Sequence, residues 1–217
     1  MPSASSANIK AALLDFDMTL VDSVPSILRA TNLFAADKGR PLVTKEKVLD
    51  SIGLPLEDTW VEFWGGYEPQ WPAEYYERYR EIEAKGFLLF PDTLSTLKAL
   101  RSASVKTAIV TNRSMAPYAV ESAGLDGFID AVVGADQVVH PKPDPEPILK
   151  ALSLVGAEPG EAIYLGDSEV DMMAGSGASV RAVGVTTGAV GREVLMEFGA
   201  WKVIGSLGEL LPLIGLA

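Results

Sequence analysis

The 217-residue chain contains no cysteine and only one histidine, His140. Without cysteine it cannot form a disulfide, a thiolate zinc site or a cysteine nucleophile, and this composition fits a reducing compartment. We therefore expect a cytoplasmic protein. His140 stands beside a proline-rich segment, and we interpret it as a packed or solvent-facing side chain rather than a catalytic one.

Positive charge is also scarce, because 18 lysines and arginines face 29 aspartates and glutamates, for a net charge of −11. Proteins that bind the phosphate backbone of nucleic acids do so with clustered lysine and arginine, so we expect no nucleic-acid partner. A negatively charged substrate would need a metal ion or local positive groups to overcome the overall field.

Long apolar runs are missing as well. No run approaches the roughly 18 apolar residues that a membrane-spanning helix requires. The first residues, Met-Pro-Ser-Ala-Ser-Ser, have neither the basic nor the apolar region of an export signal. We therefore expect no membrane partner and no export.

From about residue 89 onward, short β-branched runs alternate with amphipathic segments that end at glycine or at polar turns. The runs are typical of buried parallel strands and the amphipathic segments of helices. We expect strands at 9–15, 105–111, 131–135, 162–166, 181–185 and 202–204, and helices at 93–103, 115–123, 145–154 and 193–198. This alternation predicts an α/β fold with a Rossmann-like, doubly wound parallel sheet.

Residues 23–88 interrupt this pattern with helical periodicity throughout. Trp60, Phe63, Trp64 and Tyr67 recur at helical spacing, which predicts a small helical bundle. Three of the four tryptophans lie in this segment. They could form a stacking platform for a base or sugar, but we favour a packed aromatic core.

Two aspartates, Asp15 and Asp17, follow the first expected strand. Alternate residues of an extended segment share a face, so both can project into the crevice beyond the carboxyl ends of the strands, where ligands bind in such sheets. Two carboxylates there are costly unless a cation lies between them. Taken alone, Asp15 could equally be a helix N-cap or a turn residue.

Three further strand ends carry polar side chains. Thr111 and Asn112 precede a helix whose N–H groups would hold phosphate oxygens, although the same sequence is an ordinary capping sequence. Lys142 lies between prolines that stiffen its loop, and it would present a point charge to a phosphate or a carboxylate. Asp167 and Asp171 are four residues apart, near one face of a helix, and could bind a hard cation. Together the four strand ends predict a phosphate and metal site.

These residues resemble the motifs of the haloacid dehalogenase superfamily. Asp15-Phe-Asp-Met-Thr resembles its first motif (Asp-x-Asp-x-Thr), Thr111 its second, Lys142 its third and Gly166-Asp-Ser-Glu-Val-Asp171 its fourth. Further segments look like the phosphoglycolate phosphatase branch, namely Val21-Asp-Ser, Ile52-Gly-Leu-Pro and Lys142-Pro-Asp-Pro-Glu-Pro. Met18 departs from the glycine that is usual in that branch.

The resemblance spans nearly the whole chain. It implies a catalytic core of residues 1–22 and 89–217 and a small helical C1-type cap of residues 23–88. It also implies a Mg²⁺-dependent phosphatase, monomeric or homodimeric, whose partner is a small phosphorylated metabolite such as a phosphoglycolate-like compound or a sugar phosphate.

By the same resemblance, Asp15 is the nucleophile and Asp17 the general acid and base, while Thr111 and Lys142 stabilise the transferred phosphoryl group. Mg²⁺ would be held by the Asp15 carboxylate, the Asp17 backbone carbonyl and Asp167, with Asp171 orienting a metal-bound water or Lys142. The residues implied at the substrate are Thr19, Asn112, Arg113, Gly53 and Leu54.

Several alternatives remain open on the sequence alone. A β-phosphoglucomutase-like transferase would share the catalytic residues, although Thr19 favours hydrolysis because such mutases usually carry an apolar residue there. Dehalogenases lack the second aspartate that Asp17 provides. A phospho-accepting receiver domain also uses Asp, Thr and Lys at strand ends, but it has no cap. The phosphate ester itself cannot be read from the sequence.

Overall fold

The computed structural model describes residues 9–216, so the remaining residues of the predicted core, 1–8 and 217, lie outside the described residues. Six strands form one parallel sheet in the order β5-β4-β1-β6-β7-β8. They are β1 (Ala11–Leu14), β4 (Lys106–Val110), β5 (Ala131–Val133), β6 (Ala162–Gly166), β7 (Arg181–Val185) and β8 (Lys202–Ile204). The sheet and its alternation with helices confirm the predicted α/β class.

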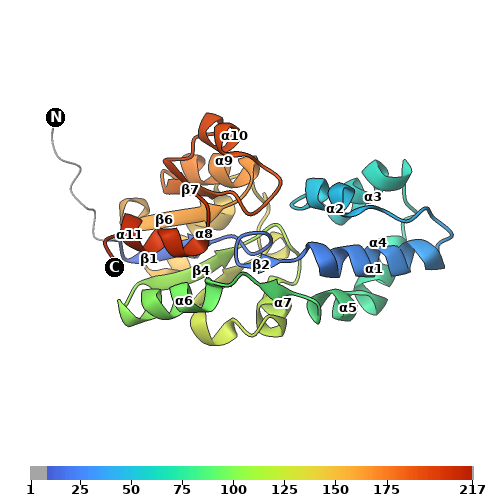
Figure 1. Ribbon diagram of the computed structural model, residues 1–217, viewed down its shortest axis with the longest axis horizontal. Coiled ribbons are helices and arrows are strands. Elements are labelled where there is room, and N and C mark those ends of the chain that lie inside the picture. Colours follow the sequence, from blue (N-terminus) through green and yellow to red (C-terminus); the bar gives the residue numbers. More distant parts are fainter. Residues whose placement is uncertain (1–8, 217) are drawn as a thin grey trace.

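Helices cover both faces of this sheet (Figure 1). The α-helices are α6 (Thr93–Ser102), α7 (Ala116–Ser122), α8 (Glu146–Val155), α9 (Glu169–Gly177), α10 (Arg192–Glu197) and α11 (Leu210–Leu213), and the short 3₁₀ helices are η1 (Asp126–Phe128), η2 (Ala135–Gln137), η3 (Pro159–Glu161) and η4 (Leu207–Glu209). Successive residues of β1 point to opposite faces. Leu14 packs in one buried cluster with Leu97 of α6, and Leu13 packs in another with Ile148 of α8.

Between β2 (Val21–Asp22) and β3 (Leu88–Leu89) the chain forms the helical insert, α1 to α5. These helices are α1 (Val24–Asp37), α2 (Lys45–Ser51), α3 (Leu56–Trp64), α4 (Trp71–Arg78) and α5 (Arg80–Ala84). β2 and β3 pair antiparallel, so the two chain crossings between sheet and insert lie side by side. In Figure 1 the insert extends from one end of the sheet.

The aromatic residues of the insert form its core. Trp60 is fully buried and stacks on Phe34, with ring centroids 5.0 Å apart and planes inclined by 11°. Trp71 and Tyr75 pack edge-on against the same Phe34 ring. The packed aromatic core that the sequence favoured is therefore observed for these side chains, whereas Tyr67 is 40% exposed.

The structure differs from the sequence prediction mainly at the ends of elements. β1 and β4 each begin and end one or two residues inside the predicted runs, although backbone hydrogen bonds to neighbouring strands continue to Lys10, Asp15 and Thr111. The β2–β3 ribbon was not predicted, since two-residue strands are too short to show a periodicity. Within residues 9–216, no helix has the length and apolar character needed to cross a membrane.

Candidate active site

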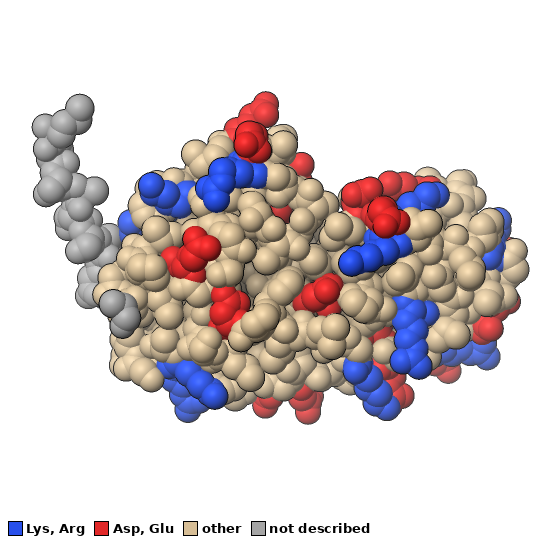
Figure 2. Space-filling model, viewed as in Figure 1, with Lys and Arg blue, Asp and Glu red and all other residues tan. Residues whose placement is uncertain are grey.

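The carboxyl ends of the parallel strands open into one cavity of about 520 Å³, between the sheet and the helical insert. Figure 2 shows the surface hollowed between these two parts. Nine of the residues proposed from the sequence line this cavity: Asp15, Asp17, Gly53, Leu54, Thr111, Asn112, Arg113, Lys142 and Asp167. Thr19 and Asp171 are buried and do not contribute to the lining.

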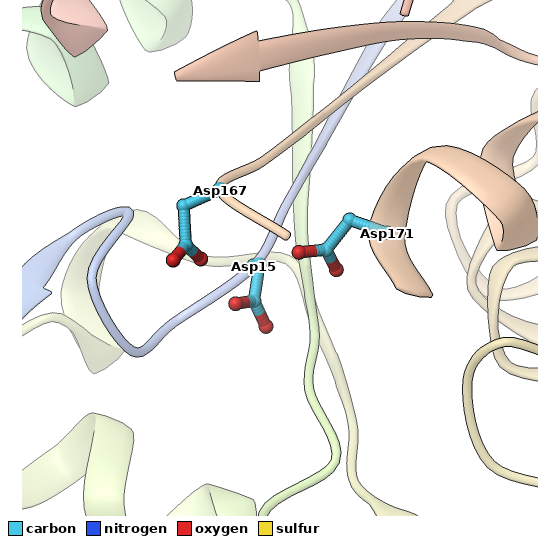
Figure 3. Close-up of side chains that lie close together, drawn as sticks. All are labelled: Asp15, Asp167 and Asp171. Atoms are coloured by element: carbon cyan, nitrogen blue, oxygen red, sulfur yellow. The ribbon is translucent and has the colours of Figure 1, made fainter. Parts of the chain in front are cut away.

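Three carboxylates meet at the carboxyl ends of β1 and β6, two of them in the cavity lining and one buried behind it. Asp15 follows β1, Asp167 follows β6 and Asp171 lies in the first turn of α9 (Figure 3). One carboxylate oxygen from each lies within 4.8 Å of the other two, and all three side chains are buried. Asp167 lies before α9 and not on one face of it with Asp171, and the turn from β6 into α9 brings both acids beside Asp15.

Two glycines leave room for these carboxylates. A Cβ at Gly166 would lie 2.3 Å from Cγ of Asp171, and a Cβ at Gly188 would lie 1.8 Å from Oδ2 of Asp167. Both distances are far below a normal carbon contact. The loop after β7 therefore needs glycine at position 188, because a residue with a Cβ would collide with Asp167.

Lys142 is the cation of this acidic cluster. Its Nζ donates to Asp15 Oδ1 at 2.8 Å and to Asp171 Oδ1 at 2.6 Å. The Val110 carbonyl at 3.2 Å and the Tyr164 hydroxyl at 3.1 Å share its third proton. The side chain is 3% exposed, so this ammonium group is held by buried partners and not by solvent.

The buried groups shift one another's pKa values. Burial raises the pKa of Asp15 to about 7, with Lys142 opposing and Asp171 and Asp17 adding to the rise. Burial and two acidic neighbours, Asp171 and Asp15, hold the pKa of Asp167 well above its usual range. For Asp171, burial acts upward, but the charge and hydrogen bond of Lys142 and the hydrogen bonds of Ser168 and Tyr164 together outweigh it, so its pKa is lowered.

Lys142 stays charged in this environment. Burial alone would lower the pKa of its ammonium group, but the ion pairs with Asp15 and Asp171 raise that pKa above its ordinary value. Asp15 and Asp171 thus share the single positive charge of Lys142. If Asp15, Asp167 and Asp171 were all ionised, that one charge would not balance their three negative charges.

The donor set fits a hard divalent cation. Carboxylate oxygens are the ligands that Mg²⁺ prefers, and a cation beside them would oppose the upward pKa shifts of Asp15 and Asp167. The side chain of Asp17 is not part of the three-acid group within residues 9–216, because it points to Arg113. A contribution of Asp17 to a metal site would have to come from its backbone carbonyl.

Arg113 joins the sheet to the helical insert. Its Nη2 donates to Asp17 Oδ1 at 2.6 Å, its Nε donates to Asp17 Oδ2 at 3.1 Å, and its Nη1 donates to Glu83 of α5. Glu83 also accepts a hydrogen bond of 2.8 Å from the hydroxyl of Tyr75. Arg113 was predicted to contact the substrate, but in this structure its guanidinium is occupied by two carboxylates.

We expect Glu83→Gln to lower the stability of the fold. The substitution keeps the size and the acceptor for Tyr75 but removes the charge that pairs with Arg113. Because hydrogen bonds to charged groups contribute about 1.5–3 kcal/mol, and Arg113 keeps its pair with Asp17, we expect a loss of about that size in the free energy of unfolding in urea.

Glu57→Gln is the matched control for this measurement. Glu57 lines the same cavity from the same insert, but it has no ion pair among the described residues. Its substitution should leave the urea midpoint within about 0.5 kcal/mol of the parent value. Equal losses in the two variants would show that the Glu83 ion pair does not stabilise the fold.

The loop that carries Asp17 is bent at Met18. Met18 has φ of +54°, in the left-handed region that glycine adopts readily and other residues adopt at a cost. Here the Met18 side chain is buried in the same apolar cluster as Val24 and Phe34 of α1, so it links the loop of Asp17 to the insert.

The remaining predicted residues are placed as follows. Thr111 is buried at the end of β4 and accepts a hydrogen bond from the Arg113 amide, while the helix itself begins later, at Ala116. The Asn112 side chain makes two hydrogen bonds of 2.9 Å with the backbone of Lys142. Thr19 donates to Asp167 Oδ1 at 3.4 Å. In this structure Asn112 thus holds the backbone of Lys142, and Thr19 contacts the Asp167 carboxylate.

Two site residues were not recognised in the sequence. Glu83 is one of many acids in the insert, and nothing in its neighbours marks it as buried. Tyr164 lies inside β6 and looks like a core residue, yet its hydroxyl donates to Asp171 Oδ1 at 2.6 Å and accepts from Lys142. A tyrosine in a strand that ends at a predicted site was the only available signal.

Comparison with known proteins agrees with this geometry. The family described as haloacid dehalogenase-like hydrolases matches residues 12–185. The chain is 32% identical over 215 residues to pyrophosphatase PpaX of Bacillus velezensis, covering 96% of this chain and 97% of that protein. It is 30% identical over 238 residues to phosphoglycolate phosphatase of Salmonella typhi, covering 96% and 94%.

A solved structure gives the same result. The crystal structure of a HAD-superfamily hydrolase of subfamily IA from Geobacter sulfurreducens superimposes with a TM-score of 0.74 at 26% identity, over 98% of this chain and all of that one. Fold and sequence comparisons therefore point to one family.

Proposed function

The chain belongs to the haloacid dehalogenase-like hydrolase family, and we propose that it is a Mg²⁺-dependent phosphatase that hydrolyses a small phosphate ester through a phosphoaspartate on Asp15. That it is a phosphatase follows from its relatives; the metal, the ester and the residue roles are our proposal. The observation that carries it is the close group of Asp15, Asp167, Asp171 and Lys142, all of which except the fully buried Asp171 line one cavity with Asp17.

In the first step an oxygen of the Asp15 carboxylate attacks phosphorus, and the bond from phosphorus to the leaving oxygen breaks. Asp17 gives its proton to that oxygen, so that an alcohol leaves and an aspartyl phosphate remains. In the second step Asp17 takes a proton from water as the water attacks phosphorus. This releases inorganic phosphate and restores the Asp15 carboxylate.

Lys142 and Thr111 support both steps by donating to the oxygens of the transferred phosphoryl group, on which stabilisation of the transition state chiefly depends. Asp171 holds Lys142 in place, and the Asn112 side chain holds the Lys142 backbone. Mg²⁺, held by the Asp15 and Asp167 carboxylates and the Asp17 carbonyl, would supply charge that offsets repulsion between the phosphate and Asp15.

The helical insert, residues 23–88, is proposed to act as a cap on a core of residues 1–22 and 89–217. Its contacts support this division: Glu83 reaches Arg113 of the core, and Gly53 and Leu54 line the cavity opposite the acids. A cap in this position would exclude bulk water during phosphoryl transfer and contact the leaving group.

A panel of small phosphate esters, assayed for inorganic phosphate with and without Mg²⁺, tests the proposal. We expect Mg²⁺-dependent release of phosphate from at least one ester. Interconversion of sugar phosphates without release of phosphate would instead identify a mutase. A stable phosphoprotein that does not turn over would indicate a phospho-accepting domain.

A further inference from the structure

We propose that Arg80 forms an anion subsite that binds a second negatively charged group, carried by the leaving group of the substrate. This inference rests on the proposed phosphatase function and deepens it, because it defines a substrate class. The preferred substrate would be a small phosphorylated compound whose other end carries a carboxylate or a second phosphate.

The argument starts from the cations of the cavity. Three basic side chains line it, and two of them already have two carboxylate partners each. Lys142 pairs with Asp15 and Asp171, and Arg113 pairs with Asp17 and Glu83. Among the described residues, Arg80 has no carboxylate partner. It is therefore the cation of this cavity that can accept an anionic ligand without breaking an ion pair.

Arg80 is held in place by weak partners that a ligand can replace. Its Nη1 donates to the thioether sulfur of Met115 at 2.9 Å, and its guanidinium lies 5.0 Å from the centre of the Tyr118 ring. A thioether is a weak acceptor, so exchanging it for a carboxylate or phosphate oxygen gains a much stronger hydrogen bond. The Tyr118 contact can persist, because a ring binds the face of the guanidinium while an anion binds its edge.

The position of Arg80 assigns it to the leaving group. It is the first residue of α5 in the helical insert, whereas Asp15, Asp167 and Lys142 lie in core segments outside the insert. Its partners Met115 and Tyr118 lie on the core segment that begins α7, so Arg80 reaches across the cavity. The transferred phosphoryl group must lie against Asp15, which leaves the insert side for the rest of the substrate.

The wall around Arg80 strengthens the interaction with an anion. Met115 and Tyr118 contact Arg80, and Tyr76 and Phe87 line the same cavity with further aromatic surface. Charges attract more strongly where such surface replaces water, and a planar guanidinium can bind either a carboxylate or a phosphate with two parallel hydrogen bonds. The leaving groups of the substrates named for the two relatives, glycolate and phosphate, both carry the negative charge that this subsite requires.

The test compares substrates that differ in the charge of the leaving group. Phosphoglycolate carries a carboxylate, pyrophosphate a second phosphate, and 2-hydroxyethyl phosphate a neutral hydroxyl of similar size. For Arg80→Gln we expect kcat/KM to fall about 10- to 100-fold with the preferred anionic substrate, mainly through KM, as loss of a charge-assisted hydrogen bond predicts. The loss with 2-hydroxyethyl phosphate should be at least about tenfold smaller. Preference for phosphoglycolate or for pyrophosphate identifies the anion.

Two further variants separate binding of the anion from folding. Arg80→Lys keeps the charge and should recover part of the loss on the anionic substrate. Arg78→Gln removes the same charge from an exposed position of the same insert and should behave as the parent protein. Equal losses on charged and neutral substrates in Arg80→Gln, or no loss on either anionic substrate, would overturn the anion subsite.

Binding to the Asp15→Asn variant, measured by calorimetry, makes the result independent of turnover. With Arg80 present, we expect phosphoglycolate or pyrophosphate to bind more tightly than 2-hydroxyethyl phosphate, and Arg80→Gln should remove that preference. If the preference is seen but no ester is hydrolysed by the parent protein, the proposed phosphatase function fails while the subsite stands. If there is no preference for an anionic ligand, the subsite is wrong.

Discussion

Asp15→Asn should abolish turnover of every phosphate ester, because an amide is a poor nucleophile and no aspartyl phosphate can form. The change is nearly isosteric, and Lys142 keeps its 2.6 Å hydrogen bond to Asp171, so we expect the fold to survive. Release of inorganic phosphate measures the activity, and far-UV circular dichroism with the unfolding midpoint verifies the fold. Residual turnover well above background would contradict the assignment of Asp15.

Asp17→Asn is the matched comparison, because it makes the same chemical change two residues away. Loss of general acid and base catalysis costs about 10²- to 10⁴-fold, but the nucleophile remains. With p-nitrophenyl phosphate, whose leaving group needs little protonation, the Asp17 variant should accumulate phosphoenzyme. After an acid quench, mass spectrometry should find one phosphoryl group on the peptide that contains Asp15. A phosphoryl group on another residue, or equal residual turnover in both variants, would overturn the two roles.

The positions of Asp15, Lys142, Asp167 and Asp171 were predictable because of a property of parallel sheets. All strands of such a sheet end at the same edge, so polar residues after several buried runs must converge even when they are far apart in sequence. The contacts of Lys142 with Asp15 and Asp171 are the observed form of that convergence. The individual roles in catalysis stay a prediction.

The partners of Arg113 could not be predicted in the same way. Its position after β4 identified it as a site residue, but its ion pair with Glu83 depends on how the helical insert that contains α5 lies against the core. Helical periodicity gives the buried face of a helix and not its partner in another part of the fold. Asn112 shows the same limit, since nothing local indicates that its amide holds the backbone of Lys142.

Removal of divalent metal should also abolish turnover, and Mg²⁺ should restore it. A second readout does not depend on activity, because an ion that binds only the folded state raises its stability. At a free Mg²⁺ concentration of 100 times its Kd the gain is about 2.7 kcal/mol. For a chain of this size that corresponds to roughly 5–10 °C in Tm. Asp167→Asn, which removes one proposed ligand charge, should lose most of the gain.

The gain in stability that Mg²⁺ gives should depend on pH, and the pKa of Asp15 sets the direction of that dependence. Its pKa is raised from 3.8 to about 7 by burial and by the nearby acids, so the folded state binds this proton more tightly than the unfolded state. The contribution of such a group to stability is complete below pH 4 and is lost as the pH rises through 7. Asp167, whose pKa is also raised, acts in the same direction.

Mg²⁺ and the proton compete for the same carboxylates, so the metal binds weakly while they are protonated. We therefore expect the difference in Tm between Mg²⁺ and EDTA to be small at pH 5 and to reach its full value above pH 7.5. Groups elsewhere in the chain change Tm equally with Mg²⁺ and with EDTA at a given pH, so their titration does not affect this difference. The same difference at pH 5 and pH 8, or an undiminished difference in Asp167→Asn, would show that Mg²⁺ binds outside the group of Asp15, Asp167 and Asp171.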